Sequence, residues 1–148
     1  MSRLESVAIN LAENLKQATP TQQRSAMIAA CKLAYQNAQL ESLVARNVLE
    51  QLAANKPFSK EQIIELEMLV EYLDNKYFSL QKNNQGNESS KHESLKFFTQ
   101  ARAVSALLFA TNLNTLIGAN ESIYEASMTL DDNSIIFQAA QEAMQLYS

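Results

Sequence analysis

The chain contains two glycines and two prolines in 148 residues, and this scarcity constrains its fold more than any other feature. Tight turns and sheet corners normally use both residue types, so a chain with so few of them has few turns. Ala, Leu, Gln, Glu and Lys, which favour helices, dominate the composition, whereas β-branched residues are sparse. The sequence therefore predicts an all-α protein with long helices and short connections.

Capping motifs locate most of the expected helix starts. Four serine or threonine residues are each followed three positions later by Glu or Gln, which is the spacing of a capping box: Ser2 with Glu5, Thr19 with Gln22, Ser59 with Gln62, and Ser90 with Glu93. Apolar residues recur at helical spacing behind each motif. We therefore expect helices over about 3–18, from 20 onward, 60–81 and 91–117.

Polar interruptions set the other boundaries. Residues 36–42 are polar, and an uncapped helix of about 35 residues is unusual in a globular domain, so we expect a break near Asn37. Residues 82–89, with the sequence Lys-Asn-Asn-Gln-Gly-Asn-Glu-Ser, are typical of a flexible loop. Residues 131–134 interrupt the chain once more before a final amphipathic helix.

The helix over 91–117 is expected to be central, because residues 101–110 are apolar on nearly every side. Gly118 is suited to end this helix, and Asn120 is suited to cap a short helix that follows it. Six or seven helices with short connections make an antiparallel helical bundle. We expect one helical domain over residues 1–148.

Charge and composition narrow the class of function. A net charge of −4 without a cluster of Lys and Arg argues against nucleic-acid binding, and an acidic chain is better suited to a basic partner. The single cysteine allows no intrachain disulfide. The sequence shows no export signal and no run apolar enough for a membrane span. We therefore expect a cytoplasmic protein that does not bind membranes.

The residues that carry most enzyme chemistry are scarce. His92 and Cys31 are the only residues of their types, and no glycine-rich phosphate loop or nucleophile elbow is present. Cys31 lies among apolar helical residues and is expected to be buried and inert. We expect no cofactor, no bound metal and no enzymatic activity; catalysis by paired carboxylates is the alternative that the sequence leaves open.

The helix over 60–81 has more apolar surface than a core requires. At about 100° per residue, one complete core face is formed by Ile63, Leu66, Leu69, Val70, Leu73, Tyr77 and Leu80. Ile64, Met68 and Tyr72 form a second stripe on the opposite side. Five carboxylates flank that stripe: Glu61, Glu65, Glu67, Glu71 and Asp74. The stripe is either a binding surface or a second buried face covered by the terminal helices of the chain.

Two hypotheses of function follow. The first is a non-enzymatic protein-interaction module, whose acidic stripe binds a basic protein or a second copy of the chain. In size, acidity and helical content the chain resembles small bacterial immunity proteins that neutralise toxins, and this resemblance implies an inhibitor.

The alternative is a small-molecule-binding helical domain with a pocket near Arg102, Phe98 and Phe109. Arg102 is the one charge within 101–110, so its guanidinium either grips a ligand carboxylate or pairs with an internal carboxylate while its stem packs on apolar surface.

Overall fold

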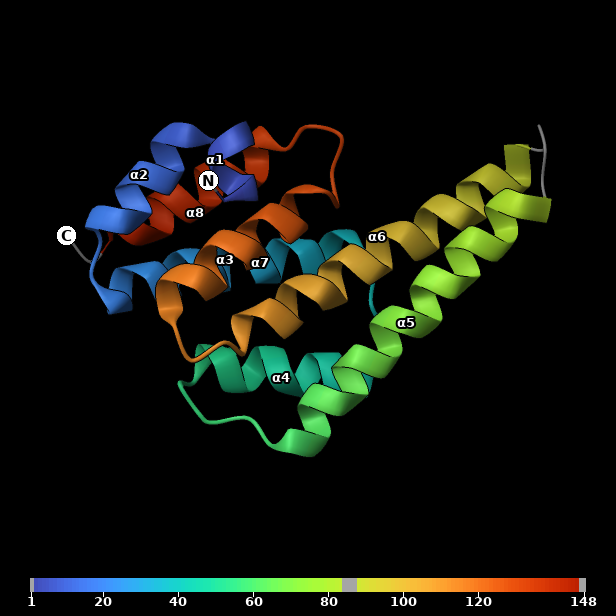
Figure 1. Cartoon of the computed structure of the whole chain (residues 1–148), viewed down its shortest axis with the longest axis horizontal. Coiled ribbons are helices and arrows are strands. Elements are labelled where there is room, and N and C mark those ends of the chain that lie inside the picture. Colours follow the sequence, from blue (N-terminus) through green and yellow to red (C-terminus); the bar gives the residue numbers. More distant parts are fainter. Residues whose placement is uncertain (1, 84–87, 147–148) are drawn as a thin grey trace.

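All regular structure in the described residues is helical. The computed structural model describes residues 2–83 and 88–146, with the backbone alone for residues 83 and 88–90. Eight helices pack together within this part of the chain (Figure 1). They are α1 (Arg3–Val7), α2 (Ile9–Gln17), α3 (Pro20–Asn37), α4 (Leu43–Ala53), α5 (Lys60–Asn83), α6 (Glu88–Ala110), α7 (Thr115–Ser127) and α8 (Ser134–Gln145). The all-α prediction is confirmed.

The helix expected over 3–18 is divided into α1 and α2. Ser2 caps α1 as predicted, because its Oγ accepts a hydrogen bond from the Glu5 N–H at 3.2 Å. At Ala8 the backbone leaves the helical region, with φ −149° and ψ 67°. Alanine itself favours helix, so local propensity does not cause the break. The break allows both short helices to pack against α7, and it makes the helix count larger than expected.

The boundaries around α3, α4 and α5 agree with the prediction. Thr19 and Gln22 form the complete capping box of α3. The expected break near Asn37 is confirmed, because α3 ends at that residue and Ser42 caps α4. The box of Ser59 and Gln62 is also formed, with hydrogen bonds of 3.1 and 2.9 Å.

The boundary between α6 and α7 differs from the prediction. α6 ends at Ala110 instead of 117, and Asn114, not Asn120, caps α7 by accepting a hydrogen bond from a backbone N–H at 3.1 Å. Gly118 lies inside α7, where a Cβ atom would be 3.1 Å from the carbonyl oxygen of Phe109. The glycine therefore permits close packing of α7 against the end of α6 and does not terminate a helix.

The connection between α5 and α6 is shorter than the loop predicted over 82–89. α5 continues to Asn83 and α6 begins at Glu88, so Ser90 lies inside α6 and does not precede it as a cap. Residues 84–87, the centre of the predicted loop, lie outside the described residues.

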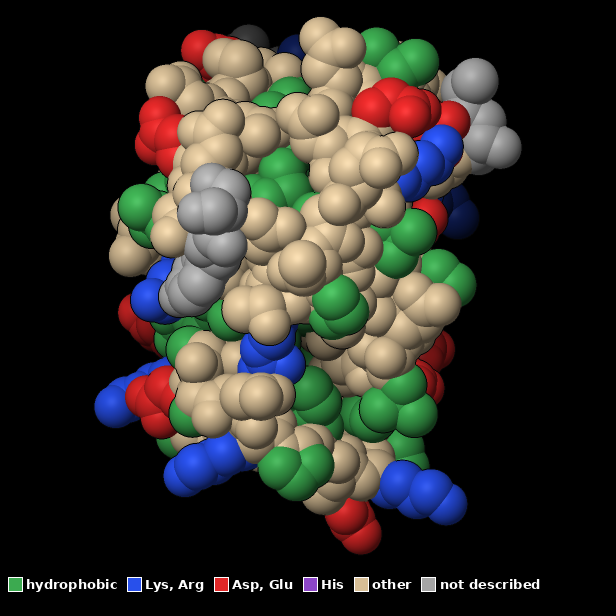
Figure 2. All heavy atoms as spheres, turned by 90° about the vertical axis from the view of Figure 1, so that its left-hand side faces the viewer, with side chains coloured by type: hydrophobic (Ala, Val, Ile, Leu, Met, Phe, Trp, Pro, Cys, Tyr) green, Lys and Arg blue, Asp and Glu red, His purple; other side chains and the backbone are tan. Residues whose placement is uncertain are grey.

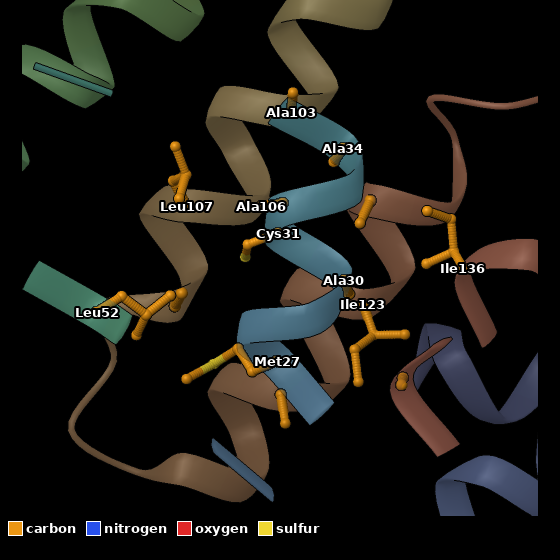
Figure 3. Close-up of a cluster of buried hydrophobic side chains, with 14 of the residues drawn as sticks. Met27, Ala30, Cys31, Ala34, Leu52, Ala103, Ala106, Leu107, Ile123 and Ile136 are labelled. Carbon is orange, nitrogen blue, oxygen red and sulfur yellow. The ribbon is translucent and has the colours of Figure 1, made fainter. Parts of the chain in front are cut away.

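The core is built around α3, α6 and α7, whereas one central helix was expected. α3 packs against α4, α6, α7 and α8, and α6 packs against α3, α4, α5 and α7. α7 packs against α1, α2, α3, α6 and α8. Small side chains line the contacts between them, which lets the helix backbones approach closely (Figure 3). The buried alanines include Ala26, Ala30, Ala34, Ala101, Ala103, Ala106, Ala119 and Ala126.

α5 and α6 form a long antiparallel hairpin whose tip projects beyond the other helices (Figure 1). Only its base contacts the rest of the protein, through α4, α7 and α3. The hairpin therefore presents the outer side of α5 to solvent along much of its length.

None of the helices in the described residues is both long enough and apolar enough to cross a membrane.

Candidate functional site

α5 has two apolar faces with opposite environments. Leu66 and Leu73 on the inner face are buried in the core, and Leu69 and Val70 pack against it. On the outer face, the exposed fractions of Ile64, Met68 and Tyr72 are 53%, 64% and 54%. The helical period produces both faces, because these three residues are four positions apart and lie opposite the buried leucines. We call Ile64, Met68 and Tyr72 the outer stripe.

No other part of the chain covers the outer stripe in the described structure. α5 packs principally against α6 and α4. The terminal helices α1, α2 and α8, which were the candidates to cover a second face, pack against α3 and α7 instead. The interpretation of the stripe as a second internal face is therefore wrong.

Carboxylates border the outer stripe on both sides. Glu61, Glu65, Glu67 and Glu71 are all exposed. Among the residues that the structure describes, these four form no ion pair. Beside the stripe, Nζ of Lys76 lies 5.7 Å from the centroid of the Tyr72 ring. The N-terminal half of the face is therefore an apolar line inside an uncompensated acidic border.

Asp74 does not belong to that border, although its position suggested that it would. Its carboxylate turns toward α6, where both oxygens lie 3.1 Å from Nη2 of Arg102. On the helical wheel Asp74 lies between the inner and outer faces. The partner on α6 therefore determines its direction.

Arg102 is held inside the protein by carboxylates of the chain. Besides Asp74, Glu125 accepts a hydrogen bond from Nη1 of Arg102 at 3.0 Å, and the Glu125 side chain is only 4% exposed. The guanidinium lies 5.7 Å from the centroid of the Phe98 ring. Internal pairing was one of the two expectations for this residue, and it is confirmed. Nη1 and Nη2 of Arg102 therefore bind carboxylates of the chain, whereas Nε is buried and has no hydrogen-bond partner within the described residues.

The surroundings of Phe109 involve a residue that the sequence analysis did not select. The guanidinium of Arg3 lies 5.8 Å from the Phe109 ring centroid and 4.4 Å from that of Tyr124. Arg3 also pairs with Glu121 and, at 3.4 Å, with Glu125. Glu121 and Glu125 are one turn apart on a largely buried helix. Because buried carboxylates require a counter-charge, this pair in the sequence could have predicted that a cation of the chain lies beside them.

The two residues with potential nucleophilic chemistry are not brought together as a site. Cys31 is buried in α3 and His92 is exposed on α6. The described residues contain no group of three or more His, Cys, Asp or Glu side chains placed to hold a metal ion. Cys31 and His92 therefore do not share a site within the described residues.

The Cys31 thiol should be almost unreactive in the native protein. Burial raises its pKa from 9.0 to about 12, although a contact with Ser122 acts in the opposite direction. This shift lowers the thiolate fraction at pH 8 by about a thousandfold, and the thiolate is the reactive form. We expect 5,5′-dithiobis(2-nitrobenzoate) to modify the native protein at least a hundredfold more slowly than the urea-unfolded chain. Equal rates would show that the thiol is exposed in solution.

The end of the molecule opposite the hairpin tip offers a contrast to α5. This end carries α2 and α8, and its hydrophobic side chains show as small patches between polar side chains and backbone (Figure 2). Charged side chains of both signs lie around its margin (Figure 2). The ordered arrangement of an apolar line and an acidic border is not repeated on this face.

Comparison with known proteins gives no match to a family model, to a curated protein or to a solved structure.

Proposed function

We propose that the chain is a non-enzymatic protein-interaction module that binds a basic protein through the outer stripe of α5 and its acidic border. The observation that carries the proposal is the exposure of Ile64, Met68 and Tyr72 on a helix whose opposite face already packs against the core. Exposed apolar side chains in a line with a polar rim are typical of binding surfaces. Tyrosine is a frequent anchor of such interfaces, and methionine adapts to irregular partners.

The dimensions of the stripe require the acidic border to take part. From Ile64 to Tyr72 the stripe extends about 12 Å along the helix axis. A stable interface buries about 800 Å² on each partner, so the contact must extend over the neighbouring carboxylates. Burying a carboxylate without a counter-charge is costly. The partner is therefore expected to surround an apolar patch with Lys and Arg.

The same charges disfavour a second copy of the chain as the occupant. A two-fold contact centred on the outer stripe places the same surface of both copies face to face. Glu61, Glu65, Glu67 and Glu71 of one copy would then oppose the same residues of the other, and like charges across an interface oppose association. A basic partner removes this repulsion. An inhibitor of immunity type would use the face in this way, by covering a basic functional surface of its target.

Replacing Tyr72 by alanine is the direct test. The Tyr72→Ala variant should bind the basic partner about 2 kcal/mol more weakly, because a central aromatic anchor carries much of the affinity of an interface. Its free energy of unfolding should change by less than about 1 kcal/mol, because the side chain is largely exposed. Calorimetric titration of the partner and urea denaturation measure the two quantities.

Phe78→Ala is the matched control. Phe78 is also an aromatic residue of α5 and is 62% exposed, but it lies outside the outer stripe. Partners are captured from cells on wild-type, Tyr72→Ala and Phe78→Ala proteins. The proposal requires a basic protein that Phe78→Ala retains and Tyr72→Ala loses. Equal retention by all three would contradict it, and a dimer in sedimentation that depends on Tyr72 would assign the surface to self-association.

A further inference from the structure

A cleft of about 480 Å³ lies at the base of the hairpin, where α5 begins and α6 ends. It is enclosed by α3, the C-terminal end of α4, the connection between α4 and α5, the start of α5, and the connection between α6 and α7. Its lining is apolar at the bottom: Met27 and Leu52 lie close together there and are almost completely buried (Figure 3), whereas Phe58 and Ile63 are partly exposed. Clefts that hold small ligands measure about 300–1,000 Å³. The space is therefore sufficient for a small molecule.

The charge of this cleft is opposite to that of the whole chain. The chain has 16 acidic and 12 basic residues, yet Arg24 and Lys56 line the cleft and no carboxylate does. Neither cation forms an ion pair with any residue that the structure describes. Two uncompensated cations beside an apolar floor create a local positive potential in an acidic protein.

Both cations are anchored in a way that leaves donors available. Nη2 of Arg24 donates to the carbonyl oxygen of Leu52 at 2.5 Å, which fixes the guanidinium at the wall of the cleft. Its remaining N–H groups have no partner within the described residues. The backbone N–H of Lys56 donates to the carbonyl oxygen of Gln51 at 2.9 Å, so the loop is fixed while the ammonium group is exposed.

Neutral polar groups complete the lining. The amide oxygen of Asn112 accepts from the Asn114 N–H at 2.8 Å, so its NH₂ group remains to donate. Capping the carbonyl group of Leu52 accounts for the position of Arg24, but it does not account for Lys56 or for the absence of carboxylates around the cleft. The cleft therefore offers three kinds of donor: a rigid guanidinium, an ammonium group and an amide NH₂ group. These donors suit an anionic head group, and the apolar lining beside them suits the apolar body of the same ligand.

We infer that this cleft binds a small organic anion, with an apolar body on the partly exposed Phe58 and Ile63 and a carboxylate or phosphate group between Arg24 and Lys56. The site is separate from the outer stripe, because Ile63 lies on the side of α5 that carries Leu66 and Leu73. Binding of the anion therefore does not depend on the proposed protein partner.

The fluorescent sulfonate 8-anilinonaphthalene-1-sulfonate is a suitable probe, because it joins an aromatic body to an anionic group. Lys56→Glu should weaken its binding to the full chain at least tenfold, since one charge-assisted contact is lost and a repulsive charge is added. Lys96→Glu is the control with the same charge change. Lys96 is exposed on α6, about 21 Å along the helix from Ala110 at the cleft, and this variant should bind the probe like the wild type.

Arg24→Met provides a second variant, checked for folding by circular dichroism, and it should also weaken the probe about tenfold. Displacement of the probe by octanoate and octyl phosphate identifies the head group that the cleft prefers, whereas octanol should not displace it. The inference is overturned if Lys56→Glu and Lys96→Glu bind the probe equally well, or if octanol displaces it as effectively as the two anions.

Discussion

Arg102→Met should lower the free energy of unfolding by about 3–5 kcal/mol, which is the usual cost of removing one member of a buried ion pair. Methionine retains the apolar stem of the arginine but removes the charge that faces Glu125 and Asp74. The Glu125 carboxylate would keep only Arg3 at 3.4 Å and the Ser105 hydroxyl at 3.3 Å. Urea denaturation followed by circular dichroism measures the loss.

Arg46→Met controls for the loss of an ion pair as such. Arg46 and Glu50 pair at 3.2 Å on α4, but their side chains are 66% and 64% exposed, so the variant should change stability by less than about 1 kcal/mol. The double variant Arg102→Met/Glu125→Met should recover part of the loss, because no unpaired carboxylate then remains buried. A loss below about 1 kcal/mol for Arg102→Met alone would mean that water reaches these charges.

The helix boundaries that could be predicted are those set by local interactions. Thr19 and Ser59 cap their helices through residues three positions later, so the motif and the structure depend on the same few atoms. The break at Ala8 has no such local signal, and the two short helices on either side of it both contact α7, far along the chain. A break of this kind could not be predicted from neighbouring residues.

Gly118 shows how one residue type supports two local interpretations. A glycine after an apolar helical run is suited to a C-cap, and it is equally suited to a helix that must pass close to another backbone. The deciding contact is with the carbonyl oxygen of Phe109, at the end of α6. Asn112 and Asn114 were the better signal for the end of that helix, because Asn114 is the cap of α7.

The outer stripe could be predicted because it depends only on the period of one helix. Ile64, Met68 and Tyr72 share a side of α5 whatever the tertiary structure, and the structure adds that this side is exposed. The direction of Asp74 and the identity of the carboxylates that pair with Arg102 could not be assigned, because each depends on partners from other helices. The cleft lined by Arg24 and Lys56 was missed for the same reason, since separate elements assemble it.

Leu66→Ala and Met68→Ala should have very different effects on stability, although the two residues are two positions apart on α5. Leu66 is completely buried, so its truncation should lower the free energy of unfolding by about 2–5 kcal/mol, from lost burial and the cavity that remains. Met68 is 64% exposed, so its truncation should cost less than about 1 kcal/mol. Urea denaturation of both variants in one buffer measures the difference.

The pair controls for the effects that the two substitutions share. Leucine and methionine have similar helix propensities, so replacement by alanine changes the intrinsic stability of α5 by nearly the same amount in both variants. The remaining difference in the free energy of unfolding reflects whether the side chain is packed in the core or exposed to solvent. A loss of several kcal/mol in Met68→Ala would mean that the outer stripe is covered in solution, and the proposed docking of a basic protein would fail. A small loss in both variants would mean that α5 is not packed on the core at all. If only Leu66→Ala lowers the free energy of unfolding by several kcal/mol, the inner face stabilises the fold and the outer stripe does not. The outer stripe is then free to bind a partner.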